Sequence, residues 1–232
     1  MKTILAIETS LGGLSLGLLQ VNSDASVQIL ELEQQSANQA AAEMLPIEVI
    51  KILGRRNLQA VDIDHYVVSI GPGSMTGIRI ALAFLQGVFA ANPLTKFYGV
   101  SALDMILLGS KRPQNSILLL PSTKTHGFVR NLDESNFLGN SSMSYRQVAE
   151  ISQQISKNGK KDRVIVLEQG TSFVASELKS LGIEIELWDK KDAFQYWLDG
   201  VSQICSTKVA KFVCAVPVAN YARASTADER RI

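Results

Sequence analysis

The chain has few of the residues that build metal centres, disulfide frameworks or basic nucleic-acid surfaces. Its 232 residues include two cysteines, Cys205 and Cys214, and two histidines, His65 and His126. The cysteine spacing fits neither a zinc knuckle nor a disulfide framework, so we interpret both as small apolar residues in a reducing compartment. A formal net charge of +1 provides no strong field for nucleic acid or for a membrane surface.

Long apolar runs are also missing. No run reaches transmembrane length, and the N-terminal residues contain no apolar region typical of a signal peptide. We therefore expect a cytoplasmic protein that does not associate with membranes. The chain does have 46% hydrophobic residues, which is enough to bury a sizeable core in one large domain or two small ones.

A glycine-rich turn at residues 71–80 organises the rest of the chain. An apolar run that fits a strand, Tyr66 to Ile70, precedes it, and an apolar helix over Met75–Ala91 follows, with Ser74 as the expected N-cap. The residues that form this turn, and that would contact an anion there, are Gly71, Pro72, Gly73, Ser74, Thr76, Gly77 and Arg79. Their spacing matches neither a P-loop nor a dinucleotide fingerprint. We predict a structural turn, and an anion contact at the helix N-terminus is the alternative.

The helix after this turn is apolar on every side. Only Arg79 and Gln86 are polar between Ile78 and Ala91. Such a helix must be buried all round, which predicts a core on one side and a second helix or a partner on the other. The preceding helix, predicted over Ser36–Leu53 and kinked at Pro46, also carries apolar residues on more than one stripe.

The order of predicted elements occurs twice. Strands at 2–7, 14–19 and 26–32 precede helix 36–53, strand 66–70, helix 75–91, strand 96–100 and helix 101–108. Strands at 116–120, 125–132 and around Phe137 then precede helix 144–157, strand 163–167, helix 171–180, strand 183–187 and helix 190–198. This order predicts a duplicated α/β protein with an N-terminal lobe over 1–108, a C-terminal lobe over 109–232 and a mobile tail over 217–232.

Three stretches carry a resemblance to a known family. Ile4-Leu5-Ala6-Ile7-Glu8-Thr9-Ser10, the turn from Gly71 to Ile80, and Gly99-Val100-Ser101-Ala102-Leu103 resemble the TsaB (YeaZ) family, from residue 3 to about 106. The resemblance implies a duplicated actin-like (ribonuclease-H-like) fold, with a mixed sheet and flanking helices in each lobe. It also implies a non-catalytic subunit that dimerises with TsaD, which makes threonylcarbamoyladenosine (t6A) at position 37 of tRNAs reading ANN codons. TsaE joins that complex, tRNA is reached indirectly, and a homodimer is expected for the chain alone.

The resemblance predicts no catalytic residue and no metal site. TsaD holds its metal through two histidines one helical turn apart, whereas this chain has Ala40 and Ala41 near the expected place. Glu8 stands where the family usually has aspartate, and Glu8, Thr9 and Ser10 are the residues expected near a nucleotide. No cofactor of its own is expected, and ATP or ADP is expected only at the interface of the complex.

The predicted partner interface lies on the two apolar helices. It comprises Met44, Leu45, Ile47, Met75, Leu82, Gln86 and Phe89. Two alternatives are open at this point. One is an ATP-binding enzyme of the actin-like or sugar-kinase-like class, or a hydrolase. The other is a tRNA-binding module that uses basic residues such as Lys157, Lys160 and Lys161.

Overall fold

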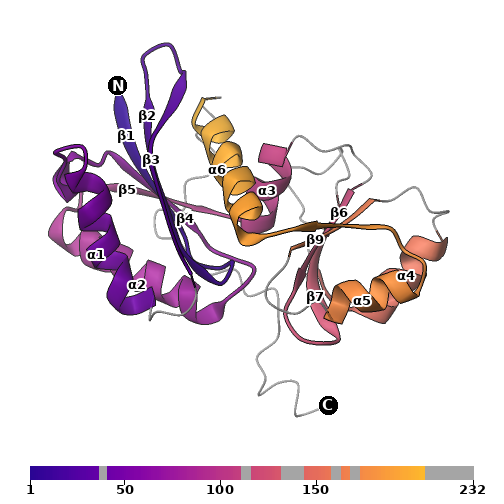
Figure 1. Ribbon diagram of the computed structural model, residues 1–232. Coiled ribbons are helices and arrows are strands. Elements are labelled where there is room, and N and C mark those ends of the chain that lie inside the picture. The colour runs from indigo at the N-terminus through magenta and orange to yellow at the C-terminus, as the bar shows by residue number, and fades with distance from the viewer. Residues whose placement is uncertain (37–40, 111–115, 132–143, 158–162, 168–172, 207–232) are drawn as a thin grey trace. The chain divides into compact units, whose positions relative to one another are not determined.

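The computed structural model describes residues 1–36, 41–110, 116–131, 144–157, 163–167 and 173–206 (Figure 1). Two compact units divide the chain. The first comprises Met1–Lys111 and Phe194–Ala219, and the second comprises Arg112–Ala193 and Asn220–Ile232. Each unit is built on a five-stranded mixed sheet.

The first sheet has the strand order β3-β2-β1-β4-β5. An antiparallel meander of β1 (Lys2–Glu8), β2 (Gly13–Val21) and β3 (Val27–Ser36) is extended by β4 (His65–Ser69) and β5 (Lys96–Val100), which run parallel to β1. The helices of this unit are α1 (Ala41–Gly54), α2 (Met75–Ala91) and α3 (Ala102–Ser110), with a short 3-10 turn η1 at Ala60–Asp62.

The two faces of this sheet are covered by different helices. Because side chains alternate along a strand, Leu5, Tyr66 and Phe97 share one face, where they pack in a buried cluster with α1 and α2. The opposite face carries Gly17 of β2, and a Cβ atom at Gly17 would press into Leu198 of α6 (Lys190–Ser206). The sheet is therefore buried between α1 and α2 on one side and the C-terminal part of α6 on the other.

The second sheet repeats the topology of the first, in the order β10-β9-β6-β7-β8. Its strands are β6 (Ser116–Pro121), β7 (His126–Asn131), β8 (Ser144–Gln147), β9 (Arg163–Leu167) and β10 (Ile185–Trp188). The helices α4 (Val148–Lys157) and α5 (Phe173–Ser180) connect the parallel strands, and Val148, Ile151, Val174 and Leu178 pack on the sheet. The predicted α/β fold with two repeated mixed sheets is confirmed.

Four local predictions differ from the structure or lie outside the described residues. Residues Ser144–Gln147, the predicted start of the helix over 144–157, form β8, which pairs antiparallel with His126–Val129 of β7. Ser36 ends β3 instead of starting α1. The predicted strand around Phe137 and the predicted tail over 217–232 lie outside the described residues.

The division into units also differs from the predicted single boundary after residue 108. Most of α6 belongs to the first unit, which resumes at Phe194. Backbone contacts show how closely it packs: a Cβ atom at Gly109 of α3 would collide with the Tyr196 carbonyl oxygen, and one at Gly200 with that of Met105. Figure 1 shows α3 and α6 side by side. Small residues at the crossing let the two helices approach.

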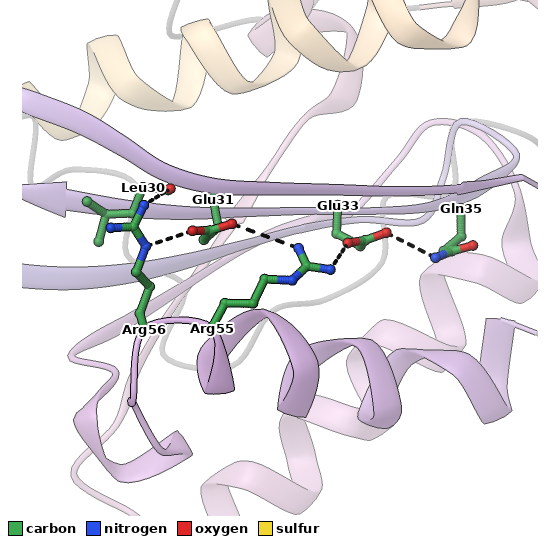
Figure 2. A network of polar contacts seen from close by, with 6 residues as sticks. All are labelled: Leu30, Glu31, Glu33, Gln35, Arg55 and Arg56. Atoms are coloured by element: carbon green, nitrogen blue, oxygen red, sulfur yellow. Dashed lines mark hydrogen bonds and ion pairs between the residues drawn. The ribbon is translucent and has the colours of Figure 1, made fainter.

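A polar network fixes the end of α1 to the edge strand β3 (Figure 2). An Arg55 guanidinium nitrogen lies 2.6 Å from a Glu33 carboxylate oxygen, and Arg56 Nε lies 2.7 Å from Glu31. Arg56 also donates to the Leu30 carbonyl at 2.7 Å. These charges line an edge strand and so oppose its pairing with another chain.

Candidate functional site

The glycine-rich turn joins β4 to α2 through backbone conformations that favour glycine. Gly71 and Gly73 have φ angles of 99° and 146°. Ser74 is the N-cap of α2, as predicted, and its Oγ accepts a hydrogen bond from Gly77 N at 3.2 Å. The Gly71 carbonyl accepts from Ala102 N at 2.8 Å, so the turn is also tied to the start of α3.

The turn packs directly on the loop after β1. Ser74 N donates to the Ser10 carbonyl at 2.7 Å, and Thr9 Oγ1 donates to the Gly77 carbonyl at 2.9 Å. A Cβ atom at Gly73 would collide with the Ser10 carbonyl oxygen, and one at Gly77 with that of Thr9. The glycines are therefore required by close backbone approach between two segments more than 60 residues apart in sequence.

Glu8 organises this loop from inside the protein. Its side chain is buried, and one carboxylate oxygen accepts from both Ser10 N, at 2.8 Å, and Ser10 Oγ. The other oxygen accepts from Leu11 N at 3.1 Å. Burial raises the pKa of Glu8, and these hydrogen bonds offset part of that effect.

The structure thus brings together Glu8, Thr9 and Ser10 and places them against the glycine-rich turn. The N–H groups of Ser10 and Leu11, which an anion at this loop would need, already donate to Glu8. Thr76 and Arg79 are exposed near the N-terminus of α2. The role of these residues toward a nucleotide or another anion stays a prediction.

The exposed faces of α1 and α2 carry large apolar side chains. Ile47 and Ile50 of α1 are 45% and 72% exposed, and Met75 and Phe89 of α2 are 42% and 44% exposed. We call these four residues, with the exposed small residues Ala83 and Gly87 and the polar Gln86 of α2, the α1–α2 surface. Open space surrounds the position of a Cβ atom at Gly87, so a partner could approach the helix backbone there.

The structure separates the predicted interface residues into three groups by exposure. Ile47, Met75, Gln86 and Phe89 are exposed, whereas Leu45 is fully buried in the core of the first unit, which corrects its assignment to the interface. Met44 and Leu82 pack against that core with part of their surface exposed. Ile50 was missed, although it follows Ile47 by three residues and so lies on the same helix face.

The described residues offer no candidate metal centre. No group of three or more His, Cys, Asp or Glu side chains among them could hold a metal ion. His65 is buried at the start of β4, and His126 begins β7, with its Nδ1 2.9 Å from Thr125 Oγ1. In the same part of the chain, no helix is long and apolar enough to cross a membrane.

The chain resembles known proteins in sequence and in fold. The family model for TsaD, tRNA N6-adenosine threonylcarbamoyltransferase, matches residues 32–137. The tRNA threonylcarbamoyladenosine biosynthesis protein TsaB of Buchnera aphidicola subsp. Baizongia pistaciae (strain Bp) is 35% identical over 116 residues, which are 50% of this chain and 48% of that protein. The chain therefore matches about half the length of this curated relative.

Two solved structures share the fold over nearly the whole chain. One is a Pseudomonas aeruginosa protein described as similar to peptidase YeaZ, with a TM-score of 0.66 and 16% identity, covering 96% of this chain and all of that one (100%). The other is YeaZ from Pseudomonas aeruginosa, with a TM-score of 0.61 and 16% identity, covering 94% of this chain and 99% of that one. The chain is thus similar in sequence to TsaB over about half of its length, and it shares its fold with YeaZ.

Proposed function

We propose that the chain is a non-catalytic partner subunit that dimerises with TsaD through the α1–α2 surface. In this role it supports threonylcarbamoylation of adenosine 37 in tRNAs that read ANN codons. The observation that carries the proposal is the surface itself: Ile47, Ile50, Met75 and Phe89 are apolar, large and 42% to 72% exposed on two helices. Such a concentration of exposed apolar side chains marks an interaction site.

The small residues of α2 support the same role. With open space around Gly87 and an exposed alanine at Ala83, a partner helix can approach the α2 backbone without meeting a long side chain. In the proposed complex TsaE joins TsaD and this chain, ATP or ADP binds at the subunit interface, and tRNA is contacted indirectly. The chain alone uses the same surface to form a homodimer.

The alternative, an ATP-binding enzyme or a hydrolase, receives no support from the geometry of the described residues. The N–H groups of the loop after β1 are paired with Glu8, and the described part of the chain has no convergent metal-ligand group. Nucleophilic catalysis would need a serine beside a positioned base. Ser10 and Ser69 lie 3.0 Å apart, but their neighbour is the carboxylate of Glu8, whose raised pKa makes it more readily protonated.

Size-exclusion chromatography with light scattering tests the proposal, with the chain alone and mixed with TsaD from the same organism. We expect a shift from a homodimer to a one-to-one complex. The variants Ile50→Glu and Phe89→Glu should abolish that shift, because each places a charge in an apolar contact. Val61→Glu is the matched control, since Val61 is 69% exposed in η1 and lies outside α1 and α2.

Two outcomes would contradict the proposal. One is a chain that stays unchanged when mixed with TsaD. The other is a complex that survives both glutamate variants while their circular dichroism spectra match that of the unaltered chain. ATP hydrolysis by the isolated chain, lost in Glu8→Gln, would favour the enzyme instead.

A further inference from the structure

The first unit contains a cavity on the sheet face opposite α1 and α2. The register pairs Ile4 of β1 with His65 of β4, and Val67 of β4 with Tyr98 of β5, so these four side chains lie on one face. They line a cavity of about 390 Å³, together with Lys2 and Val100. This volume is within the usual range for small-molecule sites.

The last turns of α6 form the other wall. Val201, Ile204 and Cys205 line the cavity. Leu198, which precedes them in α6, packs over Gly17. The helix thus closes over the middle of the sheet and leaves space near the N-terminal ends of the parallel strands. Every described residue that lines the cavity belongs to the first unit, so the site does not depend on the second.

The cavity contains a buried polar atom, His65 Nδ1, with no hydrogen-bond partner among the described residues. His65 is 9% exposed, and its Nδ1 is buried without a hydrogen bond in the described part of the protein. The rings of His65 and Tyr98 make an edge-to-face contact, with their centroids 5.4 Å apart. Buried polar atoms are normally hydrogen-bonded, so a partner at this position would have to come from a bound molecule or water.

The charges around His65 favour an anion. Lys2 lines the cavity, and Lys96 is the register partner of His65 on β5. Asp64, the nearby carboxylate, already accepts a hydrogen bond from Thr3 N at 2.7 Å. Burial and Lys2 lower the pKa of His65, and burial raises the pKa of Cys205 to about 11, so both cavity groups are neutral at pH 7. Lys2 therefore supplies the charged side chain that lines the cavity.

We propose that this cavity binds a small amphipathic carboxylic acid, with its apolar body between the sheet and α6 and its carboxylate near Lys2 and His65. The neutral imidazole donates one hydrogen bond to the carboxylate, and Lys2 supplies the opposite charge. The site is separate from the α1–α2 surface, which lies on the other side of the sheet, and does not rest on the proposed subunit role.

Isothermal titration calorimetry with octanoate on the full chain tests the site. The comparison ligands are 1-octanol and octylammonium, which keep the apolar body and change the head group. We expect octanoate to bind one molecule per chain and octylammonium to bind at least about tenfold more weakly, because Lys2 repels it. Equal affinity for all three ligands, or no octanoate binding, would overturn the proposal.

Substitutions then locate the binding. Ile204→Trp fills the cavity from α6 and should abolish octanoate binding, whereas Gln195→Trp, exposed on the same helix, should not. His65→Phe keeps the ring and removes the hydrogen bond, so it should weaken octanoate while leaving 1-octanol unchanged. Octanoate binding that survives a folded Ile204→Trp variant would place the ligand elsewhere and overturn the proposal.

A chemical readout covers the case in which Ile204→Trp does not fold. In a Cys214→Ser background, Cys205 is the one remaining cysteine of the chain, and it lines the cavity. Octanoate should slow the reaction of Cys205 with N-ethylmaleimide, with half-protection at the calorimetric dissociation constant. An alkylation rate that is independent of octanoate would contradict the site.

Discussion

Gly77 and Gly87 lie on the same helix, α2, yet a methyl group should have opposite effects at the two positions. At Gly77 a Cβ atom would collide with the backbone carbonyl of Thr9, which cannot move without disturbing the loop after β1. At Gly87 nothing lies within 4 Å of that atom. Each variant is Gly→Ala within the same helix, so each is the control for the other.

The expected sizes follow from these contacts. Overpacking a tight contact costs about 1–3 kcal/mol, and weakening the hydrogen bond from Thr9 Oγ1 to the Gly77 carbonyl costs about 1 kcal/mol more. Replacing glycine by alanine within a helix stabilises the folded protein by about 0.5–1 kcal/mol. Gly77→Ala should therefore destabilise the protein by about 1–3 kcal/mol, and Gly87→Ala should stabilise it by about 0.5–1 kcal/mol.

Urea unfolding monitored by circular dichroism measures both values. The measurement is repeated at several protein concentrations, because dimerisation through the α1–α2 surface would add to the apparent stability. If Gly77→Ala proves as stable as Gly87→Ala, the inference that Gly77 is required by its close contact with the Thr9 carbonyl is refuted.

Three further predictions concern charged and titratable groups. Burial raises the pKa of Glu8 above 4.5, so the stability that Glu8 contributes is complete below pH 4.5 and is lost as the pH rises through the raised pKa. In Glu8→Gln, the free energy of unfolding measured by urea titration should therefore fall less steeply with rising pH than in the unaltered chain. The coupling between Arg55 and Glu33, measured by a double-mutant cycle, should weaken in 1 M NaCl because Arg55 is solvent-exposed. With a pKa of about 11, Cys205 should react with N-ethylmaleimide more slowly at pH 8 than the cysteine of an unstructured peptide does, and urea should remove the difference.

The packing of α2 explains why the sequence could predict a two-sided helix but not which residue faces which side. Ile78, Ala81 and Leu85 are buried against the core, whereas Met75 and Phe89 are exposed on the α1–α2 surface. With apolar residues all round the helix, periodicity carries no information on orientation. The same ambiguity led to Leu45 of α1 being assigned to the interface although it lies in the core.

Local signals were sufficient for much of the fold. Most of the described strands and helices, the serine N-cap of α2 and the sharp turn at Gly71 and Gly73 depend on residues that are close in sequence, where backbone preference and side-chain period act directly. The sequence by itself therefore determined the duplicated α/β organisation and the place of the turn.

Only the tertiary structure decided the features that depend on distant partners. Residues Ser144–Gln147 form a strand because β7 supplies its hydrogen-bonding edge, and α6 joins the first unit because Gly17, Gly109 and Gly200 allow close approach. The burial of Glu8 and the cavity beside His65 likewise require segments from separate parts of the chain to meet. Strand pairing and burial are set by contacts across many residues, so no local pattern contains them.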